Sequence, residues 1–146
     1  MSTQANGEEL MRTVVAAFAK SDLRPLVAAL HDDILWKSAS RREGGPFSFS
    51  GDHKKMAGVL HVLSQISKDY TFEFMKPKNI VACGDVVWGM FDVCLRYEPK
   101  RKGTKAVPVK LDMAIRWQLK DRKIIEHQAF FDTAHLLMQQ TAPLHR

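Results

Sequence analysis

The clearest hydrophobic pattern in the chain lies near its C-terminal end, where two stretches alternate apolar and polar residues. Every second side chain is apolar over residues 107–119, and the alternation resumes at residue 125 after the polar turn at residues 120–123. A period of two gives an extended chain one apolar and one polar face, which is typical of half-buried β-strands. We therefore predict a hairpin, with His127 in an otherwise apolar row.

Earlier segments repeat apolar residues every three or four positions, which predicts amphipathic helices. These helices are expected to begin near residues 8, 21 and 50 and to end near residues 20, 31 and 67. Strands are predicted over residues 34–39, 70–83 and 86–97, and a last short helix is predicted to be capped by Asp132. Residues 40–49 contain a Gly-Gly-Pro turn and are expected to be mobile.

This order of elements predicts an α+β fold in a single domain, residues 1–146. A strongly twisted, mixed or antiparallel sheet can curl into a cone around the N-terminal helices and enclose a pocket. With 146 residues and 45% hydrophobic content, the chain is large enough for a substantial core. It has no apolar run of about 20 residues and no signal-like N-terminus, and Cys83 and Cys94 lack metal-type spacing, so we expect a cytoplasmic protein with free thiols.

Charge and motifs exclude several function classes. The net charge of +6 is moderate, and much of it lies in residues 96–105, a probable hairpin loop. No aromatic stacking row accompanies these basic residues, so a solvated loop is favoured over a nucleic-acid partner, and no membrane partner is expected. The sequence contains no His/Cys/carboxylate set with zinc-type spacing and no glycine-rich phosphate loop. Neither a metal nor a cofactor is expected.

Three phrases, LHDDILW, FSG before a helix, and LKDRKIIEHQAFFD before LLMQQ, resemble the nuclear transport factor 2-like superfamily, and within it the SnoaL-like, polyketide cyclase-like group. The resemblance covers about residues 8–140. It implies a cone-shaped α+β barrel and often a dimer. It does not imply one activity, because the superfamily includes isomerases, cyclases, dehydratases, epoxide hydrolases and binding domains.

Two known chemistries of that superfamily are not intact in this chain. The general-base aspartate of ketosteroid isomerase falls at Ser38, and a hydroxyl is too weak a base for that reaction. In the pattern of limonene epoxide hydrolase, one catalytic aspartate falls at Ala129 and its arginine falls at Met90, whereas its other aspartate matches Asp92. The candidate catalytic residues that remain are His127 as base or proton shuttle and Asp92 as acid or orienting group.

If Asp92 faces the pocket, the period of two brings Trp88 and Met90 inward with it and leaves Val87, Phe91 and Val93 outside. That apolar outer face predicts a homodimer through the convex side of the sheet. The expected ligand-binding wall consists of Trp36, Ser38, Met56, Trp88, Met90, Met113, Trp117 and Phe131.

Two classes of function fit this wall. One is a cofactor-independent acid–base enzyme, a cyclase, isomerase or dehydratase, acting on a small hydrophobic carbonyl-bearing substrate. The other is a module without turnover that binds a hydrophobic ligand or dimerises. His127 and the tryptophans also have a purely structural interpretation, as satisfied members of the core.

Overall fold

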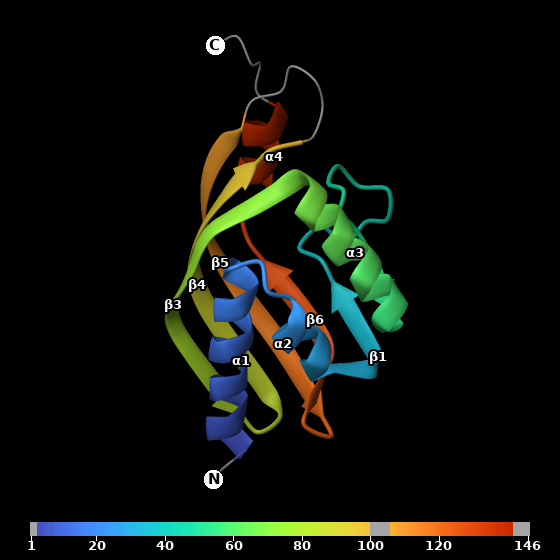
Figure 1. The fold of residues 1–146 in the computed structure, drawn as a ribbon, viewed down its shortest axis with the longest axis vertical. Helices are drawn as coiled ribbons and strands as arrows, with labels where there is room; N and C mark the ends of the chain where they lie inside the picture. Colours follow the sequence, from blue (N-terminus) through green and yellow to red (C-terminus); the bar gives the residue numbers. More distant parts are fainter. Residues whose placement is uncertain (1–2, 100–105, 142–146) are drawn as a thin grey trace.

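A computed structural model describes residues 3–99 and 106–141 of the chain (Figure 1). In this part of the chain the helices are α1 (Thr3–Ala19), α2 (Arg24–Ala29), α3 (Lys55–Asp69) and α4 (Thr133–Thr141). The strands are β1 (Leu30–Lys37), β2 (Asp52–Lys54), β3 (Tyr70–Cys83), β4 (Val86–Tyr97), β5 (Val107–Lys120) and β6 (Lys123–Phe130). The predicted helices and strands are all present, with shifted ends.

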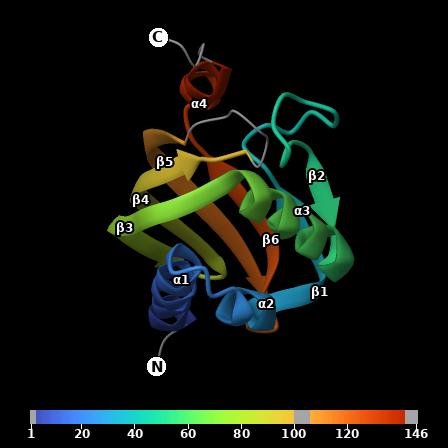
Figure 2. The ribbon, with the colours of Figure 1, turned by 45° about the horizontal axis from the view of Figure 1, so that its top comes forward.

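The strands form one curved, unclosed sheet in the order β2-β1-β6-β5-β4-β3. The pairing of β1 with β6 is parallel and the other pairings are antiparallel, so the sheet is mixed. Figure 2 shows the sheet curling so that its two edges come forward around the helices. Helix α1 packs against β3 and β4, and α3 packs against β1. The predicted α+β fold, with a curved sheet around N-terminal helices, is confirmed.

Two differences at the N-terminal side of the sheet have a tertiary cause. Leu30 was predicted to lie on the buried side of a helix that ends near residue 31, but it begins β1 and pairs with Ile124 of β6. The short strand β2 was not predicted, and it pairs with β1 before α3 begins at Lys55. For Leu30, pairing with a strand nearly a hundred residues away outweighs the local helical pattern. A periodicity argument does not detect pairing of this kind.

The segment between β1 and β2, predicted to be mobile, is docked on the core. The amide of Gly51 donates to the Ser40 carbonyl oxygen at 2.7 Å, and the Arg41 guanidinium forms two hydrogen bonds with Asp52, at 2.7 and 3.1 Å. Phe47 and Phe49 are buried, with ring centroids 4.9 Å apart. These contacts make the segment part of the wall around the interior.

The face of β4 that points inward is the opposite of the predicted one. In the antiparallel register, Phe91 lies beside Met113 of β5, and Asp92 lies beside Asp112. Because Met113 is on the inner face of β5, Phe91 is inside as well, and it has no exposed surface. Asp92 therefore points to the convex side, which corrects the expectation that it faces the pocket.

Helix α1 lies very close to this inner face at Gly89. A β-carbon there would meet the Phe91 ring at 2.5 Å and the Met11 Sδ at 2.6 Å, both far inside contact distance. Glycine therefore allows α1 to pack against β4, and the buried Phe91 and Met11 side chains fill the space that a larger residue would need.

Candidate active site and ligand pocket

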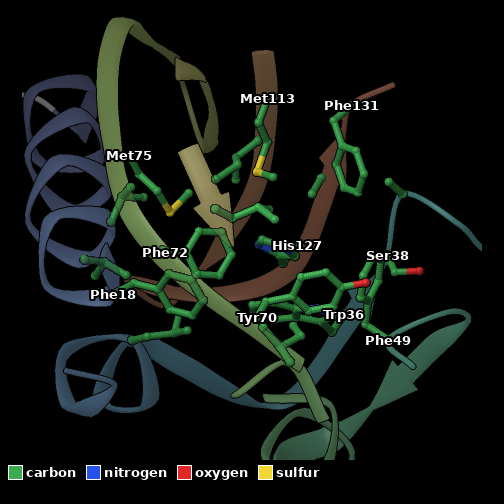
Figure 3. A pocket seen from close by; sticks show the side chains of 18 of the residues that line it. Phe18, Trp36, Ser38, Phe49, Tyr70, Phe72, Met75, Met113, His127 and Phe131 are labelled. Atoms are coloured by element: carbon green, nitrogen blue, oxygen red, sulfur yellow. The ribbon is translucent and has the colours of Figure 1, made fainter. Parts of the chain in front are cut away.

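The helices and the concave side of the sheet enclose a cavity of about 110 Å³ (Figure 3). Its walls are almost entirely apolar and come from the N-terminal helices, from the docked segment after β1, and from all the long strands. The lining residues are Val14, Val15, Phe18, Leu26, Trp36, Ser38, Ala39, Phe49, Ile66, Tyr70, Phe72, Met75, Leu95, Met113, Ile115, Trp117, His127, Ala129, Phe131 and Leu136.

His127 is part of the cavity wall and has a tryptophan on each neighbouring strand. Figure 3 shows it beside one of them, Trp36. The β6 residue His127 is paired with Trp36 of β1 on one side and with Trp117 of β5 on the other. The Trp36 ring stacks on the imidazole with centroids 3.6 Å apart and planes 16° apart. The indole Nε1 of Trp117 donates a hydrogen bond to Nδ1 of His127 at 3.0 Å. Three adjacent strands therefore hold the imidazole in one orientation.

Burial keeps this histidine neutral. His127 is buried among apolar groups, and the loss of hydration lowers its pKa from 6.5 to about 3. Asp92, proposed from the sequence as its partner, is on the other side of the sheet and does not offset this loss. Near neutral pH the pocket therefore presents an uncharged imidazole.

The hydroxyl groups of Tyr70 and Ser38 on the cavity wall have partners within the protein. The Tyr70 hydroxyl donates to Oε1 of Gln140 in α4 at 2.6 Å, and burial raises the pKa of Tyr70 above its ordinary value. The Ser38 hydroxyl donates to the carbonyl oxygen of Ser40. A ligand that enters the cavity would therefore meet mostly hydrocarbon and aromatic surface, with the imidazole of His127 among its few polar contacts.

Five of the eight predicted wall residues line the cavity: Trp36, Ser38, Met113, Trp117 and Phe131. The other three do not. Met56 packs against the core outside the cavity lining, and Trp88 and Met90 lie on the convex face, where they are 45% and 41% exposed. The placement of Trp88 and Met90 follows from the reversed orientation of β4.

Asp92 lies in a surface charge cluster, so the structure corrects its predicted position in the pocket. Its side chain is 57% exposed, and its carboxylate is 3.8 Å from the ammonium group of Lys78. Lys78 makes a shorter ion pair, 2.6 Å, with Asp112 on β5. Both carboxylates share one lysine on the outer surface, away from any group that lines the cavity.

Several large apolar wall residues were not found from the sequence, most clearly those on β3. Tyr70, Phe72 and Met75 all line the cavity, although simple alternation would turn Met75 away from the other two. The pairing with β4 shifts register between Phe72 and Phe74, and this irregularity turns Met75 inward. A bulge of this kind leaves no signal in the apolar pattern, because Phe74 and Met75 are equally hydrophobic.

Exposed apolar side chains gather on the opposite, convex face of the sheet. We define the convex patch as Val81, Trp88, Met90 and Phe130, which are between 41% and 52% exposed. The rings of Trp88 and Phe130 stack with centroids 5.8 Å apart. Four large apolar groups at one place on a sheet surface mark an interaction site more often than isolated ones do.

Within residues 3–99 and 106–141, no three His, Cys, Asp or Glu side chains come together in a way that could hold a metal ion. None of the helices described there is both long and apolar enough to cross a membrane. The basic loop considered above as a nucleic-acid partner site spans residues 96–105, and residues 100–105 of it lie outside the described residues.

The sequence matches no family profile and no curated protein. Solved structures are similar in fold. A nuclear transport factor 2-like protein from Burkholderia xenovorans LB400 is 20% identical, with a TM-score of 0.75 over 94% of this chain and 97% of its own. A protein assigned as a SnoaL-like polyketide cyclase from Jannaschia sp. CCS1 is 13% identical, with a TM-score of 0.78 over 98% and 97%. TerC, crystallised with polyporic acid, is 20% identical, with a TM-score of 0.72 over 92% and 97%.

These likenesses show the class of fold. The chain has the nuclear transport factor 2-like fold, as its sequence resemblance predicted, and its structural neighbours include a protein assigned as a SnoaL-like polyketide cyclase and another assigned as a polyketide cyclase.

Proposed function

We propose that the chain is a SnoaL-like protein whose cavity binds one small, hydrophobic, carbonyl-bearing molecule. The observation that carries this proposal is the cavity itself, which has almost wholly apolar walls with one imidazole among them. Small-molecule sites typically combine apolar walls with a few placed polar groups that fix the orientation of the ligand. The structure of TerC with polyporic acid gives independent support, because it shows a neighbour in fold crystallised with an organic compound.

The size of the cavity limits the ligand. Its volume of about 110 Å³ is comparable with the roughly 150 Å³ of an engineered apolar cavity that binds benzene. The enclosed part of the ligand is therefore about the size of one substituted ring. Acetophenone, with one ring and one carbonyl group, is a suitable probe.

Binding is better supported than acid–base turnover. A cofactor-independent cyclase, isomerase or dehydratase needs a group that takes up or releases a proton near neutral pH. Burial shifts the pKa values of the lining residues His127 and Tyr70 away from neutrality, in the direction that keeps each group uncharged. Asp92 is outside the cavity. The catalytic alternative would need a proton acceptor supplied by the ligand itself.

Filling the cavity tests the binding proposal. Ala129 lines the cavity beside His127 on β6, and Ala129→Leu would place three further carbon atoms in the space intended for the ligand. We expect acetophenone to bind the variant at least about tenfold more weakly, the order of magnitude seen when one or two carbon groups do not fit an apolar site. Isothermal titration calorimetry, combined with the methyl NMR signals of Met75 and Met113, measures the affinity and locates the probe.

Ala57→Leu is the matched control, because Ala57 is an exposed alanine on α3, outside the lining residues. It should leave the affinity unchanged. If acetophenone binds the wild type and Ala129→Leu equally well, or perturbs neither methionine, the cavity is not its binding site and the proposal is wrong.

We also propose that two copies of the chain associate through the convex patch. The charges beside the patch are paired within the subunit: Glu126 accepts hydrogen bonds from Lys37 and Arg116, both at 3.0 Å. The surface therefore offers apolar area with few uncompensated charges, and it carries both signs, so the same face of a second copy is complementary to it. The patch proposed here differs from the predicted one, which contained the buried residues Val87, Phe91 and Val93.

Trp88→Glu is expected to convert this dimer into monomers, because a carboxylate at the centre of the patch would lose water without gaining a partner. Sedimentation velocity at micromolar concentration measures the change. Leu60→Glu on α3 is the matched control, since Leu60 is 46% exposed and Trp88 is 45% exposed. A wild type that sediments as a monomer, or a Trp88→Glu variant that stays dimeric, would contradict the proposed interface.

A further inference from the structure

The hydrogen bond between Trp117 and His127 determines which ring nitrogen of the histidine carries a proton. An indole N–H can only donate, so Nδ1 of His127 must accept and is unprotonated. A neutral imidazole carries one proton, which is then on Nε2. We propose that Trp117 holds His127 as a hydrogen-bond donor and thereby makes the cavity selective for ligands with a neutral acceptor, such as the carbonyl group of a ketone or quinone. This inference rests on the proposed ligand-binding function.

The donor is available to a ligand. Nε2 has no hydrogen-bond partner among the side chains and backbone of residues 3–99 and 106–141, and it is not closed off from open space, since His127 lines the cavity. The stacked Trp36 ring fixes the plane of the imidazole, and the bond from Trp117 fixes its rotation within that plane. The Nε2–H group is therefore preorganised, and a ligand does not have to order it.

The apolar walls around the Nε2–H donor determine which ligands can bind to it. A carbonyl oxygen gains a hydrogen bond there and keeps its apolar remainder against apolar walls. A hydrocarbon of the same shape would leave the buried Nε2–H without a partner. An anionic carboxylate would lose its hydration for a single neutral donor, and an ammonium group would find no acceptor on His127, so both charged classes are disfavoured.

The same geometry changes the role of His127 from the one predicted. A base must offer a free lone pair, but Nδ1 already accepts from Trp117 and Nε2 already carries a proton. His127 therefore polarises a carbonyl group by donating to its oxygen. Trp117 acts through His127 and is a positioning residue.

Two probes of nearly equal shape test the selectivity. Acetophenone and α-methylstyrene differ by a carbonyl oxygen in place of a methylene group. We expect acetophenone to bind the wild-type protein on the order of tenfold more tightly, the effect of one buried hydrogen bond. Trp117→Phe keeps an aromatic ring in the wall but frees Nδ1, so the ratio of the two affinities should fall toward one, whatever the smaller ring does to both affinities in common.

A second measurement needs no variant. The ¹⁵N shifts of His127 in the wild-type protein without ligand should be pyridine-like at Nδ1 and pyrrole-like at Nε2, and added acetophenone should shift Nε2 the more strongly. Trp117→Phe should reduce the difference between the two nitrogens. A merely structural role for Trp117 would leave that difference unchanged.

The outcomes separate the two proposals. If both probes bind the wild type with equal affinity, or if the proton is found on Nδ1, the donor assignment is overturned and the ligand pocket stands. If neither probe binds, the proposed function fails, and the selectivity inferred from it fails with it. Weaker binding of both probes to Trp117→Phe by the same factor would reduce Trp117 to a wall residue and overturn its positioning role.

Discussion

Replacing Phe91 with glutamate is expected to unfold the protein. Phe91 has no exposed surface, lies beside Met113 of β5, and fills the space between α1 and β4 at Gly89. A carboxylate there would be buried without a partner, and the lost ring would leave a void, so the free energy of unfolding should fall by more than about 4 kcal/mol. Urea unfolding followed by circular dichroism measures the loss, and little folded protein should remain at 37 °C.

Trp88→Glu is the matched control, because it introduces the same charge on the same strand but on the convex face. Its effect on the stability of the subunit should be within about 1 kcal/mol, once the contribution of association is removed by dilution. A stable, folded, monomeric Phe91→Glu variant would instead mean that Phe91 faces outward and that the orientation of β4 described above is wrong.

Strand β4 shows what alternation could and could not predict. Its existence and length followed from the apolar composition of residues 86–97, and the structure agrees. Its inward face did not follow, because Val87, Phe91 and Val93 alternate with the equally apolar Trp88 and Met90. The residue partners on β5 decide between the two faces, and pairing register is a long-range property.

The candidate site was predicted best where one face of a strand is polar. On β5 and β6 mostly polar outer residues leave a single choice of inner face, so Trp117 and His127, and Phe131 directly after β6, were placed correctly at the cavity. What alternation could not give is the contact between these side chains. Trp117 meets His127 because the two strands pair at that position, and Trp36 meets it through a parallel pairing with a distant part of the chain.

These contacts also explain why the sequence suggested acid–base chemistry. A histidine in an apolar row with an aspartate nearby in the expected fold is typical of a catalytic pair. In the structure the aspartate lies on the other face of the sheet, and a tryptophan takes its place as the hydrogen-bond partner of His127. An indole donor imposes a neutral, donating imidazole, whereas a carboxylate would have favoured a charged one.

The buried His127 is expected to make folding strongly dependent on pH. Its pKa is about 3 in the folded protein and 6.5 in an unfolded chain, so between these values the unfolded state binds more protons. The free energy of unfolding should therefore fall as the pH drops from about 6.5 to about 3, by a total on the order of 4 kcal/mol. Above pH 6.5 both states carry a neutral imidazole, and this dependence should vanish.

His127→Gln isolates the effect, because glutamine does not titrate and its carbonyl oxygen can still accept from Trp117. The unfolding free energies of wild type and variant are measured by urea titration from pH 8 to pH 4. The difference between them should shrink steadily below about pH 6.5. It should change sign if the wild type is only slightly the more stable at neutral pH. The exposed His61 on α3 provides the control. The unfolding free energy of His61→Gln should change with pH in parallel with that of the wild type. A wild-type curve that stays parallel to His127→Gln across this range would mean that the imidazole is hydrated in the folded protein, and the neutral donor assigned to the cavity would lose its basis.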